Sequence, residues 1–258
     1  MSARALVWNY GGGTQSVAIG VLIKRGLLPR PELAIMVKLP REMPGTFRYL
    51  DAHVRPLLDA AGVPLHVFEP PTSAVRDYWD ESATVPLTPG FTAQGRLPTL
   101  CSGNWKRDNV LRELRRLGYG PDRPITQWLG YSVDEMERAA TQSRRQWATL
   151  AFPLLQLVPL RREHCRRLVL DEGLPDPPRS RCYDCGNQRN PEWREVRDAE
   201  PELFQLAVRR DEAIRARDLR HDLYLHRAAR PLAEVDLDAG EDAPSLFDAG
   251  CNSAGCFT

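Results

Sequence analysis

Three consecutive glycines near the amino terminus are the first feature with readable chemistry. Gly11, Gly12 and Gly13 follow a short apolar run and precede a helical pattern that begins at about Thr14. Glycines let the backbone approach a ligand closely, and successive N–H groups at a helix start attract an anion. We therefore expect phosphate to bind at Gly11, Gly12, Gly13, Thr14, Gln15 and Ser16. The residues exclude a P-loop and a Gly-x-Gly-x-x-Gly loop, and a tight turn without a ligand is the structural alternative.

Six cysteines form the second group of reactive residues. Cys182-x-x-Cys185 alone is compatible with a zinc site, a redox pair or half of an iron–sulfur site. A zinc knuckle needs two more ligands, and no second nearby Cys-x-x-Cys supplies them. Cys165 lies in a predicted amphipathic helix, where we expect a core residue. Cys251 and Cys256 lie in a glycine-flanked tail, where a thiol could carry sulfur, bind a metal or remain in solvent.

Charged residues gather after an apolar run over residues 125–129. Asp134 and Glu135 stand just past this predicted strand, where ligands bind in open α/β sheets. A helix N-cap with first-turn carboxylates is the structural alternative. Lys106 and Arg138 offer positive charge to phosphate or sulfate. A local basic patch fits either a solvated helix face or contact with nucleic acid or polyphosphate, and it comprises Arg161, Arg162, Arg166, Arg167, Arg179 and Arg181.

Alternating strands and helices must position these groups. Apolar runs predict strands, and helical periodicity predicts helices between them. The strands cover 5–8, 33–37, 63–68 and 125–129, and the helices cover 14–25, 47–61 and 105–117. This order implies an α/β fold with a doubly wound parallel sheet. Helices over 162–172 and 192–217, a hairpin from 223–225 and 232–235, and the cysteine-bearing tail predict a smaller, mostly helical C-terminal portion. We expect domains over residues 1–160 and 161–258.

Composition limits the function classes. The chain has 258 residues, of which 42% are hydrophobic and 27% charged, and its formal net charge is +1. That balance is typical of a globular protein and excludes a uniformly basic nucleic-acid coat. No apolar run approaches the ~18–20 residues of a membrane span. The N-terminus lacks a secretory pattern, and six cysteines are too few for a disulfide scaffold, so we expect a cytoplasmic protein.

The glycine loop resembles the Ser-Gly-Gly-x-Asp-Ser pyrophosphate loop of the adenine-nucleotide alpha-hydrolases, the PP-loop superfamily. That superfamily includes N-type ATP pyrophosphatases, tRNA thiolation enzymes and phosphoadenylyl-sulfate (PAPS) reductases. Further stretches are similar to the reductase-like branch, and the resemblance covers residues 4 to about 195. These stretches are Arg41-Glu42, Cys101-Ser-Gly-Asn-Trp-Lys106, Gly130-Tyr-Ser-Val-Asp-Glu135 with Arg138, and Cys182-Tyr-Asp-Cys185. The loop departs from the family pattern where Gly11 replaces the serine and Gln15 replaces the acidic residue.

The resemblance implies an enzyme that binds ATP, or PAPS/APS, together with Mg²⁺. Residues 11–16 and Glu42 would hold the nucleotide. The cleft would be lined by Lys106, Asp134, Glu135 and Arg138. Cluster-containing relatives set a cysteine after the third strand against a later Cys-x-x-Cys, so the implied ligands of a 4Fe–4S cluster are Cys101, Cys182 and Cys185. Cys251 or Cys256 would carry sulfur or supply a fourth ligand.

The function expected from these features is ATP-dependent sulfur transfer. ATP would adenylylate a substrate oxygen and release pyrophosphate, and a cluster-bound or persulfide sulfur would then displace AMP. The acceptor would be a base of tRNA or DNA or a nucleoside, with a sulfur-donor protein and a second copy of the chain as further partners and no membrane. One alternative is a PAPS/APS reductase, although the Glu-Cys-Gly-Leu-His motif of assimilatory reductases is absent. Another is a non-catalytic subunit of a modification or defence complex that binds an adenine nucleotide or nucleic acid.

Overall fold

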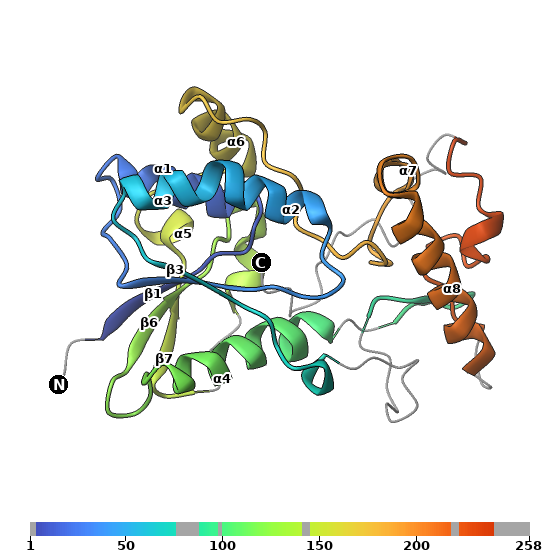
Figure 1. Ribbon diagram of the computed structural model, residues 1–258, viewed down its shortest axis with the longest axis horizontal. Helices are drawn as coiled ribbons and strands as arrows, with labels where there is room; N and C mark the ends of the chain where they lie inside the picture. Colours follow the sequence, from blue (N-terminus) through green and yellow to red (C-terminus); the bar gives the residue numbers. More distant parts are fainter. Residues whose placement is uncertain (1–3, 76–87, 98–99, 141–144, 218–221, 240–258) are drawn as a thin grey trace. The chain divides into compact units, whose positions relative to one another are not determined.

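The computed structural model describes residues 4–75, 88–97, 100–140, 145–217 and 222–239, which form two compact units (Figure 1). Unit 1 is built from Met1–Pro70 and Trp105–Ser180, and unit 2 from Pro71–Asn104 and Arg181–Cys256. Unit 1 extends past the boundary expected at residue 160, because α6 (Arg162–Asp171) packs against α1 (Thr14–Lys24). Cys251 and Cys256 lie outside the described residues. No helix of the described chain is long and apolar enough to cross a bilayer.

Unit 1 is an α/β unit around a five-stranded sheet, which confirms the expected fold class. The strands lie in the order β3-β2-β1-β6-β7, and every neighbouring pair is parallel. They are β1 (Ala5–Asn9), β2 (Leu33–Val37), β3 (Leu65–Phe68), β6 (Ile125–Trp128) and β7 (Ala148–Ala151). β7 has no counterpart among the predicted strands, because its sequence Ala-Thr-Leu-Ala contains a single large apolar residue.

Helices cover both faces of this sheet. α1, α2 (Pro44–Tyr49) and α3 (Arg55–Ala60) lie on one face, and α4 (Asp108–Arg116) lies on the other (Figure 1). A π-helical turn, η1 (Leu50–Val54), joins α2 to α3, which accounts for the single helix predicted there. A second π-helical turn, η3 (Ser102–Arg107), leads into α4. Two short elements complete the unit, the 3₁₀ segment η4 (Val133–Ala140) and α5 (Pro153–Gln156).

The core of unit 1 holds α1 against the sheet. Val17, Ile19 and Leu22 of α1 are buried with Trp8 of β1 in one hydrophobic cluster. α1 packs against α3, α5 and α6 as well, so it is apolar around most of its circumference. This packing fixes the start of α1 relative to the end of β1.

The described residues of unit 2 form two α-helices, short 3₁₀ turns and a small antiparallel sheet. The helix predicted over 192–217 is two helices, α7 (Asn190–Ala199) and α8 (Pro201–Arg217), because the residue before Pro201 leaves the helical conformation. β4 (Phe91–Thr92) pairs with β5 (Gly95–Arg96), and Phe91 also pairs with Tyr224. The predicted hairpin is wrong, because Tyr224 pairs with Phe91 and η5 (Leu232–Glu234) is a 3₁₀ turn. A further 3₁₀ turn, η2, covers Thr72–Ala74.

Candidate functional site

The glycine loop joins β1 to α1 at the carboxyl edge of the sheet. Gly12 has φ +81°, and a Cβ there would lie 2.8 Å from Thr46 Cγ2, so the fold itself requires glycine. Gly13 precedes α1 in an extended conformation, and within the described chain no side chain caps the helix. Ser16 Oγ accepts a hydrogen bond from the Gly11 N–H at 2.9 Å, which closes the loop. The first-turn N–H groups of α1 are therefore arranged for an anion such as phosphate.

A second loop meets the glycine loop where the strand order reverses, between β1 and β6. Gly130 follows β6, and a Cβ on it would lie 3.4 Å from Ser16 Oγ. Gln15 Nε2 donates a hydrogen bond to Glu135 Oε2 at 3.0 Å, and Glu135 forms an ion pair with Arg138. The loop after β6 thus supplies a carboxylate beside position 15, where the glycine loop itself has an amide. Ligands bind at such a reversal in open α/β sheets.

Arg138 is held at this edge by aromatic packing as well as by charge. Its side chain is 10% exposed, and its guanidinium carbon lies 4.4 Å from the centroid of the Tyr131 ring. Tyr131 in turn stacks on Phe152 with ring centroids 5.5 Å apart. A guanidinium with this support keeps its orientation when an anion approaches.

Asp134 has a structural role. Its carboxylate accepts the backbone N–H of Arg162 at 2.6 Å and the side chain of Arg161 at 3.3 Å. Arg162 is the first residue of α6, so Asp134 caps that helix from another part of the chain. The structural alternative, that an acidic residue here caps a helix, therefore holds for Asp134. The helix that it caps is α6 and not η4, to which Asp134 itself belongs.

An open cavity lies beside the glycine loop, at the carboxyl ends of β1 and β2. Its walls are formed by Asn9, Tyr10, Gly11, Ile35, Met36, Val37, Glu42, Lys106 and Val110. Because Gly11 belongs to both the cavity and the loop, one ligand can place an apolar group in the cavity and an anionic group on the loop.

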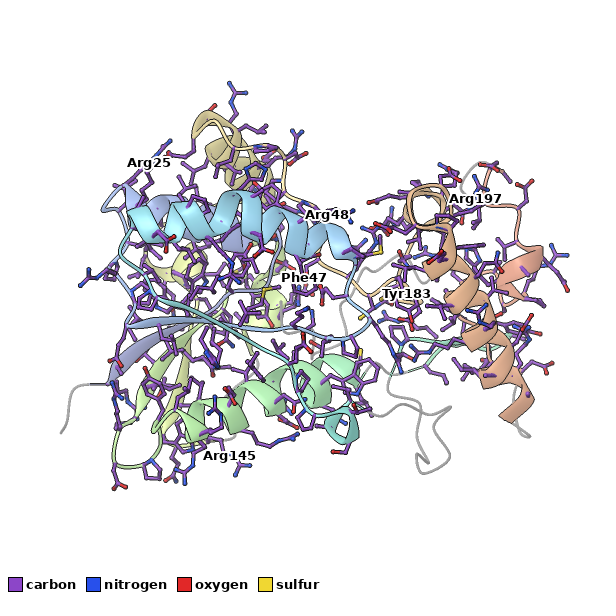
Figure 2. The ribbon with its side chains drawn as sticks, in the orientation of Figure 1. Arg25, Phe47, Arg48, Arg145, Tyr183 and Arg197 are labelled. Atoms are coloured by element: carbon purple, nitrogen blue, oxygen red, sulfur yellow. The ribbon has the colours of Figure 1, made fainter. Side chains whose placement is uncertain are left out.

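Two of the expected site residues form the charged wall of this cavity. The Glu42 side chain is 1% exposed, and Lys106 Nζ lies 3.4 Å from its Oε2. The Ser180 hydroxyl donates to Oε1 of the same carboxylate. Lys38 Nζ lies 5.4 Å from the ring centroid of Phe47, which is labelled on α2 in Figure 2. Glu42 therefore gathers a cation and a hydroxyl from distant parts of unit 1.

Sequence reasoning missed the polar groups at the end of β1. Gln127 Nε2, on β6, donates to Asn9 Oδ1 at 2.9 Å. Asn9 Nδ2 and the Tyr10 hydroxyl are buried and have no hydrogen-bond partner among the described residues. A polar residue at the end of an apolar run, two positions before the first glycine of the loop, is the signal that could have identified Asn9.

The cysteine motif lies in a turn of unit 2. The Cys185 N–H donates to the Cys182 carbonyl at 3.3 Å, and Tyr183 lies within the turn (Figure 2). Asp184, also in the turn, forms an ion pair with Arg210 of α8, and both side chains are 1% exposed. A buried ion pair of this kind holds the turn in place, because breaking it leaves an uncompensated charge.

Cys101 belongs to the same unit. Burial lowers the pKa of the Arg96 guanidinium on β5, and the charges of Cys185 and Cys101 oppose that shift, so both thiols lie within electrostatic range of one arginine. A Cβ on Gly186, next to Cys185, would lie 2.8 Å from the Leu225 carbonyl oxygen, so the turn packs directly on backbone. Across the described ranges, no three Cys, His, Asp or Glu side chains are grouped closely enough to hold a metal ion.

Cys165 is a core residue, as expected. Its side chain is fully buried in the hydrophobic cluster around α1. Burial raises the pKa of its thiol to about 12, so the reactive thiolate is scarce at neutral pH.

The basic patch on α6 carries less free charge than its sequence indicates. Arg166 pairs with Asp176 at 2.7 Å, and Arg167 pairs with Asp171 at 3.2 Å. Arg161 pairs with Asp134, which also accepts the backbone N–H of Arg162 at the start of α6. These arginines are therefore paired with carboxylates, as on a solvated helix face.

Comparison with solved structures finds similar folds at low sequence identity. The structure of PAPS reductase from Candida auris in a phosphate complex is 13% identical, with a TM-score of 0.44 over 68% of this chain and 76% of that chain. The U34-tRNA thiolase NcsA from Methanococcus maripaludis, with its 4Fe–4S cluster, is 14% identical, with a TM-score of 0.46 over 81% and 70%. NMN synthetase from Francisella tularensis is 13% identical, with a TM-score of 0.42 over 67% and 63%.

These three enzymes belong to the PP-loop superfamily, which the glycine loop resembles in sequence. At these identities the similarity concerns the fold. No protein-family model and no curated protein matches the chain.

Proposed function

We propose that this chain is an enzyme that binds ATP and activates its substrate by adenylylation. The observation that carries the proposal is that the cavity and the glycine loop share Gly11. The apolar side chains of the cavity wall suit the face of a heterocyclic base, and the loop suits the phosphates attached to it. Glu42 and Lys106 form an ion pair in the cavity wall. A nucleotide bound there would contact both side chains.

The chemical step would cleave ATP between its α- and β-phosphates. A substrate oxygen attacks the α-phosphorus, the bond from that phosphorus to the bridging oxygen breaks, and pyrophosphate leaves with the electron pair. The N–H groups at the start of α1 and the guanidinium of Arg138 stabilise the negative charge that develops on the leaving group. Their positions are set before reaction, because Glu135 and Tyr131 hold Arg138.

Mg²⁺ bound with ATP would neutralise phosphate charge during this step. Such an ion takes most of its ligands from phosphates and water, so one protein carboxylate is enough. Glu135 fits that requirement, because the Gln15 amide holds its carboxylate at the edge of the loop.

Sulfur transfer to the activated substrate is the finer part of the proposal. A sulfur-donor protein would transfer the outer sulfur of its own persulfide to a cysteine thiolate of unit 2, and the cysteine persulfide so formed would attack the carbon that carries the AMP group, so that a C–S bond forms and AMP leaves. A second thiol would then break the S–S bond and release the thiolated product as a disulfide forms, and a dithiol on a sulfur-donor protein would reduce that disulfide. Three thiols in one unit, Cys101, Cys182 and Cys185, support this assignment. A base of tRNA or DNA or a nucleoside is the proposed acceptor.

The described cysteines supply the type of ligand that a 4Fe–4S cluster needs, but their side chains are not grouped closely enough to hold one. Thiolates are the ligands that such clusters take. The described side chains do not form a group that could hold a metal ion, so we derive no step through a cluster. Iron and sulfide analysis of protein purified without oxygen, with Cys182→Ala as the control, tests whether one is bound.

Glycine-to-alanine substitutions separate the ligand from the fold. A Cβ on Gly13 would meet no atom of the described chain within 4 Å, so Gly13→Ala changes the space a phosphate would use and leaves the protein packing intact. A Cβ on Gly45, in α2, would meet only Arg48 at 3.9 Å, which makes Gly45→Ala the matched control. We expect calorimetry to show ATP binding by wild type and Gly45→Ala, and weakened binding by Gly13→Ala.

Product analysis tests the reaction itself. ATP incubated with the enzyme and tRNA, DNA or nucleosides should yield AMP and pyrophosphate. ADP and phosphate as the products would contradict adenylylation, and sulfite released from PAPS would favour a reductase. A folded wild-type protein that does not bind ATP would remove the basis of the proposal.

A further inference from the structure

Asn9 is a polar group of the cavity that the proposed reaction does not use. It is the last residue of β1, is 6% exposed and lines the cavity. Gln127, on the neighbouring strand β6, donates Nε2–H to Asn9 Oδ1 at 2.9 Å. Asn9 Nδ2 has no partner within the part of the chain that the structure describes. A buried N–H without an acceptor is unfavourable, so this group is placed to donate a hydrogen bond to a bound ligand.

The hydrogen bond from Gln127 determines which end of the Asn9 amide is available. Because Oδ1 is occupied, the remaining group is a donor. Tyr10, 2% exposed, also lines the cavity, and burial raises the pKa of its hydroxyl, so that it too stays a donor. Ile35 and Val37 make the neighbouring wall apolar. Hydrogen-bond donors in apolar surroundings suit a flat heterocycle whose ring nitrogens accept hydrogen bonds.

We propose that Asn9 recognises the purine base of the nucleotide by donating a hydrogen bond from Nδ2 to a ring nitrogen. This inference rests on the proposed function, because it places the phosphates of the same nucleotide on the glycine loop. The two features then bind different parts of one ligand. The loop holds any linear polyphosphate, whereas Asn9 adds affinity only when a base is attached.

Calorimetric titration with ATP and with inorganic tripolyphosphate separates these parts. Asn9→Asp keeps the size of the side chain and can still accept from Gln127, but it replaces the donor by an acceptor. We expect the ratio of ATP affinity to tripolyphosphate affinity to fall about tenfold in Asn9→Asp, as expected for the loss of one buried hydrogen bond. The added negative charge weakens both polyanions, so the ratio reports on the base. Gly13→Ala should weaken both ligands and leave the ratio unchanged.

Asn9→Leu provides the same test without a charge, and it should lower the ratio to a similar extent. Thermal unfolding of each variant without ligand shows whether it is folded. A wild-type ratio in a folded Asn9 variant would overturn the inference while the proposed function stands. Wild-type protein that binds ATP no more tightly than tripolyphosphate would also overturn it. Wild-type protein that binds neither ligand would overturn the proposed function and the inference together.

Discussion

Replacing Gln15 by glutamate tests the contact between the glycine loop and the loop after β6. The Gln15 amide donates to Glu135 at 3.0 Å, so Gln15→Glu would place two carboxylates where a donor and an acceptor now meet. The change also introduces the acidic type of residue that the resembling family has at this position. If the glycine loop made no contact with the loop after β6, glutamate at position 15 would be tolerated. The observed contact with Glu135 makes glutamate there unfavourable.

The cost of Gln15→Glu can be estimated from the contact. Two like charges 4 Å apart repel by about 4 kcal/mol at an effective dielectric constant of 20. The Glu135 side chain is 23% exposed and pairs with Arg138, so solvent and the guanidinium reduce that repulsion. The lost hydrogen bond to a charged group adds about 1.5–3 kcal/mol when it is well ordered. We expect a net destabilisation of about 2 kcal/mol, which for a chain of this size lowers Tm by about 4–8 °C.

Differential scanning calorimetry of a double-mutant cycle measures this coupling. Gln15→Glu with Glu135→Gln restores an amide–carboxylate pair in the reverse order, so the double variant should recover at least half of the lost Tm. Gln205→Glu, at an exposed position on α8, is the control and should leave Tm nearly unchanged. If Gln15→Glu has the Tm of wild type, or if the two changes are simply additive, the two loops are not coupled through this contact.

Three further predictions concern groups whose surroundings are well defined. Arg210→Met should lower the free energy of unfolding in urea by about 3–5 kcal/mol, because it leaves the buried carboxylate of Asp184 unpaired. Arg209→Met, at an exposed neighbouring position, should leave that free energy nearly unchanged, and equal effects of the two changes would refute the role of the ion pair. Because burial raises the Cys165 pKa to about 12, mass spectrometry should find that thiol unmodified by iodoacetamide at pH 8 until the protein is denatured, and rapid labelling of folded protein would contradict its core position. The hydrogen bond from Arg116 lowers the pKa of Glu113 from 4.5 to about 2, so the Glu113 carboxylate stabilises the fold fully above pH 4.5 and loses this effect as the pH falls toward 2. The difference in Tm between wild type and Glu113→Gln should therefore shrink over that range, and a constant difference would argue against the contact.

The strands of unit 1 were predictable because their pattern is local. Ala5–Asn9, Leu33–Val37 and Ile125–Trp128 are apolar runs bounded by polar residues or turns, and a run buried on both faces needs no other information to indicate a strand. β7 carries no such run and forms because β6 offers it an edge. The break between α7 and α8 was readable from Pro201, but the helical periodicity on both sides obscured it.

The candidate site was predictable in its residue types and less so in its contacts. Glu42 and Lys106 were expected from the resemblance and do lie together in the cavity wall. Asp134 and Glu135 are adjacent in sequence, yet one caps α6 and the other holds the glycine loop. No local pattern distinguishes the two carboxylates, because their partners lie in segments distant from them along the chain.

The parallel α/β character of unit 1, the glycine turn before α1 and the core position of Cys165 follow from the amino-acid sequence alone. Each depends on backbone freedom or on apolar periodicity, which neighbouring residues set among themselves. Three contacts become visible only in the folded chain: Gln15 donates to Glu135, Gln127 orients the amide of Asn9, and Asp184 ties the cysteine turn to α8. These contacts join residues far apart in sequence, so they depend on the order of the strands and the packing of whole helices, which no single segment specifies.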